Sequence, residues 1–198
     1  MSLEIKQEKN KKLKIINTAN NLDKQLGQGK SAKNDPFYDV PGDQKFKEFN
    51  LQIMEEMYAM LEANRDNEEH SVLILDDIGA QLRKSAGAEK KLVSLLQNRR
   101  HVFTSVFILV QRFRDLPTGI RANMSHFCSF RPKNMLEEEA ICCETMPFHK
   151  KNWRQIMDYV FDNSDKFSFL MIDMSLKETN QYKYYNKFDP MEINENTT

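Results

Sequence analysis

Two adjacent carboxylates, Asp76 and Asp77, follow a run of four apolar residues at 72–75. Such a short apolar run is typical of a buried β-strand, and ligands of open α/β sheets bind at the carboxyl ends of the strands. A nucleotide hydrolase uses one acid to hold Mg²⁺ and another to position or deprotonate the attacking water. Two acids at a strand end can also serve as a helix N-cap and a turn residue, so the pair alone leaves both roles open.

The residues that follow the acids add further groups suited to phosphoryl transfer. Arg99 and Arg100 stand just before the apolar segment 102–110, and Gln111 stands just after it. An amide at a strand end can orient water or sense a phosphate, and an arginine can stabilise the transition state in a neighbouring active site. A nuclease is the alternative, but two-metal cleavage needs more clustered carboxylates than the sequence places near Asp76.

A phosphate-binding loop is the expected companion of such acids, and only one segment approaches its pattern. The loop has the form Gly-x-x-x-x-Gly-Lys-Ser/Thr between a buried strand and a helix. The segment "KQLGQGKS" ends in Gly-Lys-Ser with Lys30 and Ser31, but Lys24 replaces the first glycine. Polar residues precede it, and two prolines downstream prevent a long helix. We therefore interpret it as a lysine-rich loop.

Strand patterns alternate with helical patterns along the chain. The strand patterns lie at the start of "LKIINTANNLD" and at 72–75, 102–110, 126–130, 167–173 and 181–185. The helical patterns lie from Phe46 to about Asn64, around Leu92 to Leu96, and at 135–146 and 153–161. This alternation predicts an α/β fold with a mainly parallel sheet flanked by helices, in which the strands at 72–75 and 102–110 are neighbours. The continuous run at 72–75 predicts a strand covered on both faces.

Length and composition indicate one ordinary domain. The 198 residues carry 29 basic and 29 acidic side chains, so bulk charge does not predict nucleic-acid binding. We expect a disordered polar leader at 1–12, an α/β domain at 13–190 and a polar tail at 191–198. No apolar run approaches the roughly 20 residues that span a bilayer, so no membrane partner is expected. The three cysteines lack paired metal-ligand spacing, which favours a reducing compartment.

The central motifs resemble a known family. The order "LILDD", "RRH", an apolar strand closing on Gln111, and "LPTGIRANMSHFCSFRPKN" resembles the DNA-packaging ATPases of poxviruses and other large nucleocytoplasmic DNA viruses. These belong to the HerA–FtsK class of P-loop NTPases. The resemblance covers about residues 12–190 and implies an incomplete P-loop NTPase core that uses ATP and Mg²⁺.

The resemblance also implies roles for individual residues. Asp76 would be the Mg²⁺-linked acid, Asp77 the catalytic carboxylate, Gln111 the strand-end sensor and Arg100 an arginine finger that acts across a subunit interface. Arg121 would belong to the nucleotide-binding residues.

Two residues of the "IRAN" stretch have less definite roles. Arg121 could instead be a structural ion-pair partner. Asn123 belongs to the same stretch, and the resemblance gives it no definite role.

The resemblance further implies a motor that drives genomic DNA into capsids. Its partners would be double-stranded DNA, a viral capsid protein and further subunits in a homo- or hetero-oligomeric ring. Its location would be viral factories in the host cytoplasm, with the virion as a second location. The phosphate loop of this family should precede "KIINTANNLDK", so we expect the chain alone to bind ATP poorly. Three explanations stay open: a split gene whose separately encoded fragment supplies the loop, a truncated gene model, and a subunit that has lost autonomous ATP binding. The alternative is a catalytically inactive homologue that acts as an interaction or regulatory subunit.

Overall fold

The computed structural model describes residues 14–19, 40–146, 150–162, 167–175 and 183–191. The chain divides into two compact units. The first contains the residues up to Gln111 together with 115–120, and the second contains 112–114 and the residues from Arg121 onward. The lysine-rich segment with Lys30 and Ser31 lies outside the described residues, as do the expected leader at 1–12 and the expected tail apart from Met191, which belongs to a strand.

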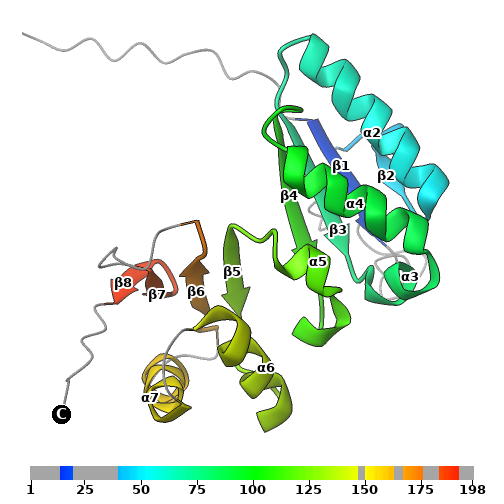
Figure 1. The fold of residues 1–198 in the computed structure, drawn as a ribbon. Helices are drawn as coiled ribbons and strands as arrows, with labels where there is room; N and C mark the ends of the chain where they lie inside the picture. Colours follow the sequence, from blue (N-terminus) through cyan, green and yellow to red (C-terminus); the bar gives the residue numbers. More distant parts are fainter. Residues whose placement is uncertain (1–13, 20–39, 147–149, 163–166, 176–182, 192–198) are drawn as a thin grey trace, which may run out of the picture. The chain divides into compact units, whose positions relative to one another are not determined.

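The first unit is built on a parallel sheet of four strands (Figure 1). Its strands are β1 (Lys14–Ala19), β2 (Lys45–Phe46), β3 (Ser71–Asp76) and β4 (Thr104–Leu109), in the spatial order β2-β1-β3-β4. Strands β3 and β4 are parallel neighbours, with Ser71 opposite Thr104 and Asp76 opposite Leu109. The α/β fold and the pairing of these two strands are therefore confirmed.

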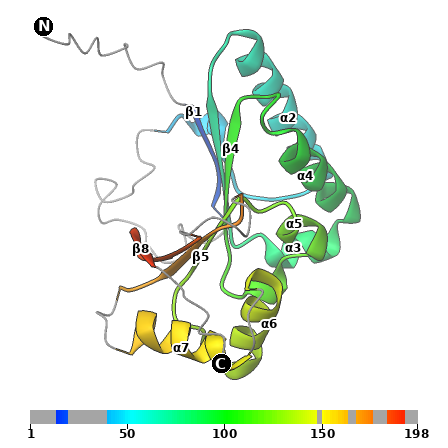
Figure 2. The same cartoon turned by 60° about the vertical axis from the view of Figure 1, so that its left-hand side comes forward.

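Helices cover one face of this sheet. The helical elements of the first unit are η2 (Gly42–Gln44), α2 (Leu51–Asp66), α3 (Gly79–Lys84) and α4 (Ala86–Asn98), and α5 (Thr118–Arg121) begins in it. Figure 2 shows α2 and α4 on the same side of the sheet. Their core side chains pack with those of β3; the fully buried members include Met54, Met57, Leu61, Leu73, Leu75, Leu92 and Leu95.

The other face of the sheet is only partly covered. The alternate residues Val72 and Ile74 are half-buried, while Phe107 and Leu109 in β4 are 55% and 50% exposed. Because side chains of a strand alternate between two faces, a run that is apolar throughout places apolar groups on both. Among the described residues the two long helices lie on one face (Figure 2), so the prediction that residues 72–75 are covered on both faces stays a prediction for the face of Val72 and Ile74.

The start of α2 differs from the expected helix. The apolar spacing predicted a helix from Phe46, but α2 begins at Leu51, because the side chain of Asn50 accepts a hydrogen bond from the N–H of Ile53 at 3.0 Å. Phe49 and Met54 flank this N-cap and are both buried in the same core cluster, as in a hydrophobic staple. Phe46 belongs to β2 instead.

The second unit contains a separate antiparallel sheet. Its strands are β5 (His126–Ser129), β6 (Leu170–Asp173), β7 (Tyr184–Asn186) and β8 (Asp189–Met191), paired in chain order. Its helical elements are η3 (Phe113–Asp115), α6 (Met135–Thr145) and α7 (Lys150–Phe161). The expected domain at 13–190 therefore comprises two units, and β2 and β8 were not anticipated because they have only two and three residues. Within the described residues, no helix has the length and apolar character needed to cross a bilayer.

Candidate functional site

The parallel register brings the acids and the amide to one end of the first sheet. Ala19, Asp76 and Leu109 lie opposite one another at the carboxyl ends of β1, β3 and β4. The N–H of Asp77 donates to the carbonyl oxygen of Leu109 at 3.0 Å, which continues the pairing one residue beyond β3. Gln111 follows two residues after Leu109 and is exposed. The end of the sheet therefore presents two carboxylates and an amide.

Asp77 makes the turn that leads out of β3. Its φ is 51°, in the left-handed region, which aspartate tolerates better than most residues. The next residue, Ile78, is fully buried and is the N-cap residue of α3, with no side-chain capping hydrogen bond. Of the two structural roles left open by the sequence, Asp77 therefore fills the turn and neither acid caps the helix.

Asp76 is in an environment that disfavours its charge. Partial burial raises the pKa of the Asp76 carboxyl, and the neighbouring charge of Asp77 raises it further. A divalent cation beside the two carboxylates would oppose both effects. Mg²⁺ in nucleotide sites is held by one or two carboxylates together with substrate phosphates and water, so the acid pair fits this ion in number and ligand type.

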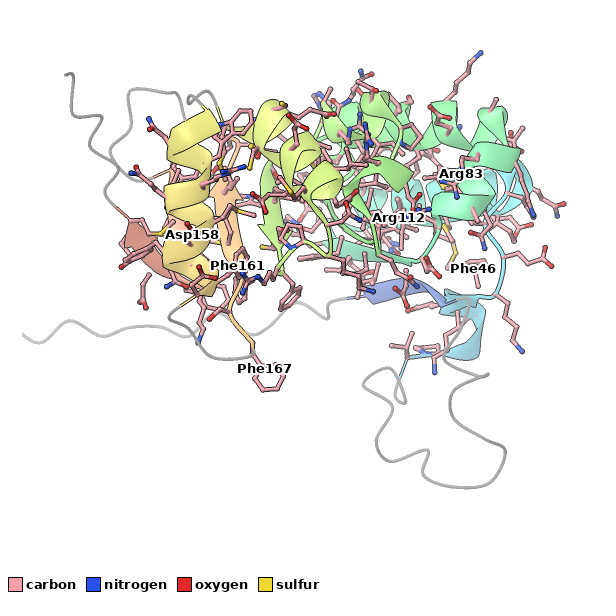
Figure 3. The ribbon with its side chains drawn as sticks, turned by 90° about the horizontal axis from the view of Figure 1, so that it is seen from below. Phe46, Arg83, Arg112, Asp158, Phe161 and Phe167 are labelled. Carbon is pink, nitrogen blue, oxygen red and sulfur yellow. The ribbon has the colours of Figure 1, made fainter. Side chains whose placement is uncertain are left out.

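A contact between distant segments braces the acidic turn. Gly79 lies so close to the loop after β4 that an added Cβ would approach the Cβ of Asp115 to 3.0 Å. Asp115 accepts a hydrogen bond from Arg83 of α3 at 2.8 Å; Figure 3 labels Arg83. These contacts hold the start of α3 against the segment that follows Gln111. The sequence analysis missed these positioning residues, although a glycine two positions after the acids was an available signal.

Arg100 lies at the opposite end of the sheet from the acids. It is exposed in the turn between α4 and β4, where its carbonyl oxygen accepts a hydrogen bond from Phe103. Strand β4 runs for six residues from this turn to Leu109. At roughly 3.3 Å per residue, the strand is about 17 Å long. The structure therefore does not bring Arg100 together with Asp77 of the same chain.

Arg121 makes an ion pair and a cation–π contact in the second unit. Its Nε donates to the Oε2 of Glu144 in α6 at 2.7 Å, and its guanidinium lies 5.0 Å from the ring centroid of Phe113. The ion pair considered for Arg121 from the sequence is thus present, and its role toward a nucleotide stays a prediction. Asn123 is half-buried just after α5, and the structure gives no reason to assign it to a nucleotide site.

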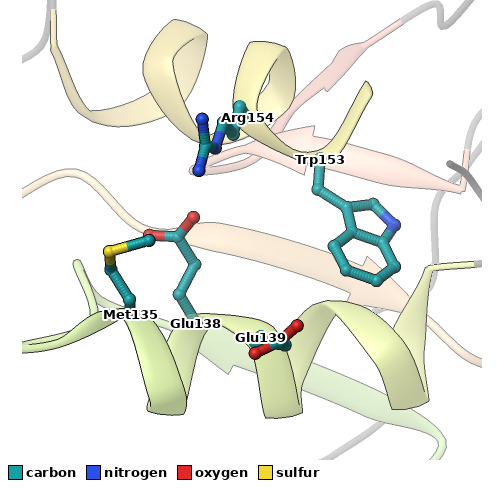
Figure 4. A pocket seen from close by; sticks show the side chains of 5 residues that line it. All are labelled: Met135, Glu138, Glu139, Trp153 and Arg154. Atoms are coloured by element: carbon teal, nitrogen blue, oxygen red, sulfur yellow. The ribbon is translucent and has the colours of Figure 1, made fainter. Parts of the chain in front are cut away.

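A small pocket elsewhere is too confined for a nucleotide. It lies between α6 and α7 of the second unit and has a volume of ≈ 30 Å³, against roughly 300–1,000 Å³ for small-molecule sites. Figure 4 shows its lining residues, Met135, Glu138, Glu139, Trp153 and Arg154. Among the residues that the structure describes, no three His, Cys, Asp or Glu side chains gather as a metal cluster. The acidic end of the parallel sheet remains the candidate site.

The fold and the site together define an α/β protein whose parallel sheet presents an acid pair at its carboxyl end. The sequence profile of the family described as "Poxvirus A32 protein" matches residues 38–198. The chain belongs to this family, which confirms the resemblance found in the sequence.

Individual relatives match over shorter stretches. The DNA packaging protein OPG160 of Variola virus is 40% identical over 67 residues, which is 34% of this chain and 23% of the relative. The protein of the same name from Monkeypox virus is 40% identical over 67 residues, 21% of its length. The matched segment thus spans less than a quarter of these relatives.

The comparison with solved structures includes a viral NTPase. The genome packaging NTPase B204 from Sulfolobus turreted icosahedral virus 2, in complex with AMPPCP, has 16% sequence identity and a TM-score of 0.48 over 65% of this chain and 60% of that one. Its complex with AMP gives 15% identity and a TM-score of 0.48 over the same shares.

We predict that Gly79→Ala destabilises the first unit. The added methyl group would press on the Cβ of Asp115, and such overpacking costs about 1–3 kcal/mol. Gly42→Ala is the matched control, because its methyl group would meet nothing within 4 Å, and it should be neutral or stabilise by up to about 1 kcal/mol. Thermal denaturation of the two variants measures the difference. Equal melting temperatures would show that the contact between α3 and the Asp115 loop is loose.

We predict that Asp76→Asn stabilises the protein at neutral pH. The folded-state pKa of Asp76 is raised, so folding disfavours the ionised form, and this penalty is present above the folded pKa and lost as pH falls through it. The melting temperature should rise by a few degrees at pH 7 and match that of the parent protein below about pH 4. Glu55→Gln, on the exposed side of α2, is the control. A lower melting temperature for Asp76→Asn at pH 7 would contradict the electrostatic account.

Proposed function

We propose that this protein is a viral DNA-packaging ATPase, or the C-terminal part of one, that couples ATP hydrolysis to the translocation of genomic DNA into capsids. The observation that carries the proposal is the meeting of Asp76, Asp77 and Gln111 at the carboxyl end of the parallel sheet. Family membership supports it, since the relatives are named DNA packaging proteins.

In the proposed site each side chain has a distinct task. Asp76, at the end of β3, would hold Mg²⁺, and this ion would offset negative charge during phosphoryl transfer. Asp77 accepts the proton of the attacking water, and its position in the turn directs it out of the strand. Gln111 orients that water or senses the γ-phosphate. Gly79 and Asp115 position the turn and the loop relative to each other.

Arg100 acts on the nucleotide of a neighbouring subunit in this proposal. Its exposure supports this role, as does the length of β4 that separates it from the acids of its own chain. An arginine finger of this kind requires an oligomer, either a ring of identical subunits or a mixed ring. The further partners are double-stranded DNA and a viral capsid protein, and the site of action is the viral factory in the host cytoplasm.

In this proposal the phosphate loop follows a strand that pairs with β4. Strand β4 lies at the edge of its sheet among the described strands and carries no charged residue. Uncharged edge strands pair readily with further strands. The exposed side chains of Phe107 and Leu109 provide an apolar surface beside that edge. A strand that pairs parallel to β4 would end beside Asp76 and Gln111, where its loop could reach the nucleotide.

Complementation tests this function. We expect the chain mixed with a polypeptide that contains a strand, a Gly-x-x-x-x-Gly-Lys-Ser/Thr loop and a helix to hydrolyse ATP in the presence of Mg²⁺. Asp77→Asn should abolish turnover and leave ATP binding intact, because the carboxylate activates water. Steady-state hydrolysis and ATP titration of the same mixtures separate the two effects. If no mixture hydrolyses ATP although the fragment binds, the protein is the inactive homologue.

Arg100→Ala should lower turnover by a factor of roughly 10³ or more, whereas Lys90→Ala, an exposed cation on α4, should not. An Arg100→Ala subunit should impair the active site of the neighbouring subunit and not its own, because the finger acts across the interface. Mixing Arg100→Ala subunits with Asp77→Asn subunits should therefore restore part of the activity through mixed interfaces. Full activity of Arg100→Ala by itself would refute the finger assignment.

A further inference from the structure

Three phenylalanines gather at one end of the antiparallel sheet, and we name this group the aromatic cap: Phe130, Phe169 and Phe188. The ring of Phe169 lies 5.9 Å from that of Phe130 and 5.3 Å from that of Phe188, measured between centroids. Despite these contacts, Phe130 and Phe188 are 64% and 76% exposed, and Phe167, two residues before Phe169, is 72% exposed. The side chain of Phe167 points away from the second unit in Figure 3.

The strand register places the cap at a single edge of the sheet. Ser129, Leu170 and Asn186 lie opposite one another at the ends of β5, β6 and β7. Phe130 and Phe169 are the next residues beyond this end, and the N–H of Lys187 donates to the carbonyl oxygen of Phe169 at 2.8 Å. The cap is therefore held by backbone pairing and is not a chance grouping of loop side chains.

The arrangement is costly for the folded chain. Three exposed phenylalanines leave a large apolar area in water, and exposed apolar patches mark interaction sites. The turn between β7 and β8 adds backbone strain, because Lys187 has a φ of 58° where glycine or asparagine would be favoured. This turn presents Phe188, the most exposed member of the cap. Such local strain is typical of binding segments.

Cations and acids alternate around the rings. Arg131 follows Phe130 and is ion-paired with Asp162 at 2.8 Å while its side chain remains 66% exposed. Lys133 is exposed, and Lys187 and Asp189 flank Phe188. Exposed aromatic rings with a few cations form the stacking platforms that bind single-stranded nucleic acids, since every base has a π-face.

We propose that the aromatic cap binds single-stranded DNA by stacking unpaired bases on Phe130 and Phe188. This inference rests on the proposed DNA-packaging function and adds to it a contact with DNA in the second unit. Because only a few cations surround the rings, stacking provides most of the affinity. The salt dependence should then be weak, with log K falling at a slope of about −1 to −2 against log salt concentration, as for two or three phosphate contacts to a single strand.

Fluorescence anisotropy with a labelled oligothymidylate of about 16 nucleotides and a duplex of equal length tests the proposal. Phe188→Ala and Phe130→Ala should each weaken single-strand binding roughly 5- to 150-fold. Phe188→Leu should weaken it similarly, because leucine is apolar but offers no π-face, and Phe188→Trp should retain it. Tyr159→Ala, an exposed aromatic residue on α7, is the control and should bind like the parent protein. Circular dichroism verifies the fold of each variant.

Four outcomes would overturn the proposal. If Phe188→Leu binds the oligothymidylate as well as the parent protein, stacking is not the interaction. If the parent binds the duplex while the oligothymidylate binds weakly and no cap variant changes either affinity, this inference fails and the packaging function stands. If neither DNA binds, this inference fails, and the hydrolysis experiment decides the packaging function. If sedimentation shows self-association that Phe188→Ala abolishes, the cap is a protein interface instead.

Discussion

The parallel register between β3 and β4 is the constraint on which the candidate site depends. Six consecutive residue pairs, from Ser71 with Thr104 to Asp76 with Leu109, bring both strands to an end at the same level. The hydrogen bond from Asp77 to Leu109 extends this register into the turn. A slip of one residue would exchange the two faces of a strand, which would expose Leu73 and Leu75 and misplace the acids. The core that holds these leucines against α2 and α4 therefore also positions the site.

The site itself works against the stability of the fold. Asp76 has a pKa raised by burial and by its neighbour, Asp77 occupies a left-handed backbone conformation, and a Cβ added at Gly79 would approach that of Asp115 to 3.0 Å. The charge of Asp76 and the conformation of Asp77 cost free energy in the folded state, and strained or destabilised groups cluster at functional sites. The packing of Leu73 and Leu75 beneath the turn offsets these costs. The aromatic cap of the second unit combines exposure and backbone strain in a similar way.

Periodicity and short apolar runs were enough to predict the elements around the site. The runs at 72–75 and 102–110 predicted β3 and β4, and their close spacing with one helical pattern between them predicted parallel neighbours. The patterns at 126–130, 167–173 and 181–185 predicted β5, β6 and β7, but not their antiparallel pairing in a separate sheet, because pairing direction is not visible in spacing. Strand β8 was missed because three residues carry no clear period. The contact between Gly79 and Asp115 and the ion pair of Arg121 with Glu144 join residues far apart in sequence, which spacing alone does not reveal.

In the proposed function, the carboxyl end of the parallel sheet binds a divalent metal with a nucleotide. Paramagnetic line broadening by Mn²⁺ in the amide NMR spectrum tests this binding directly, because the effect falls steeply with distance from the ion. We expect a titration with Mn²⁺ to broaden the amides of Asp76, Asp77 and Gln111 first and to leave those of Ser71 and Thr104, at the other end of the same strands, sharp. Broadening that begins at the carboxylates of α6, or that affects both ends of the sheet equally, would contradict it.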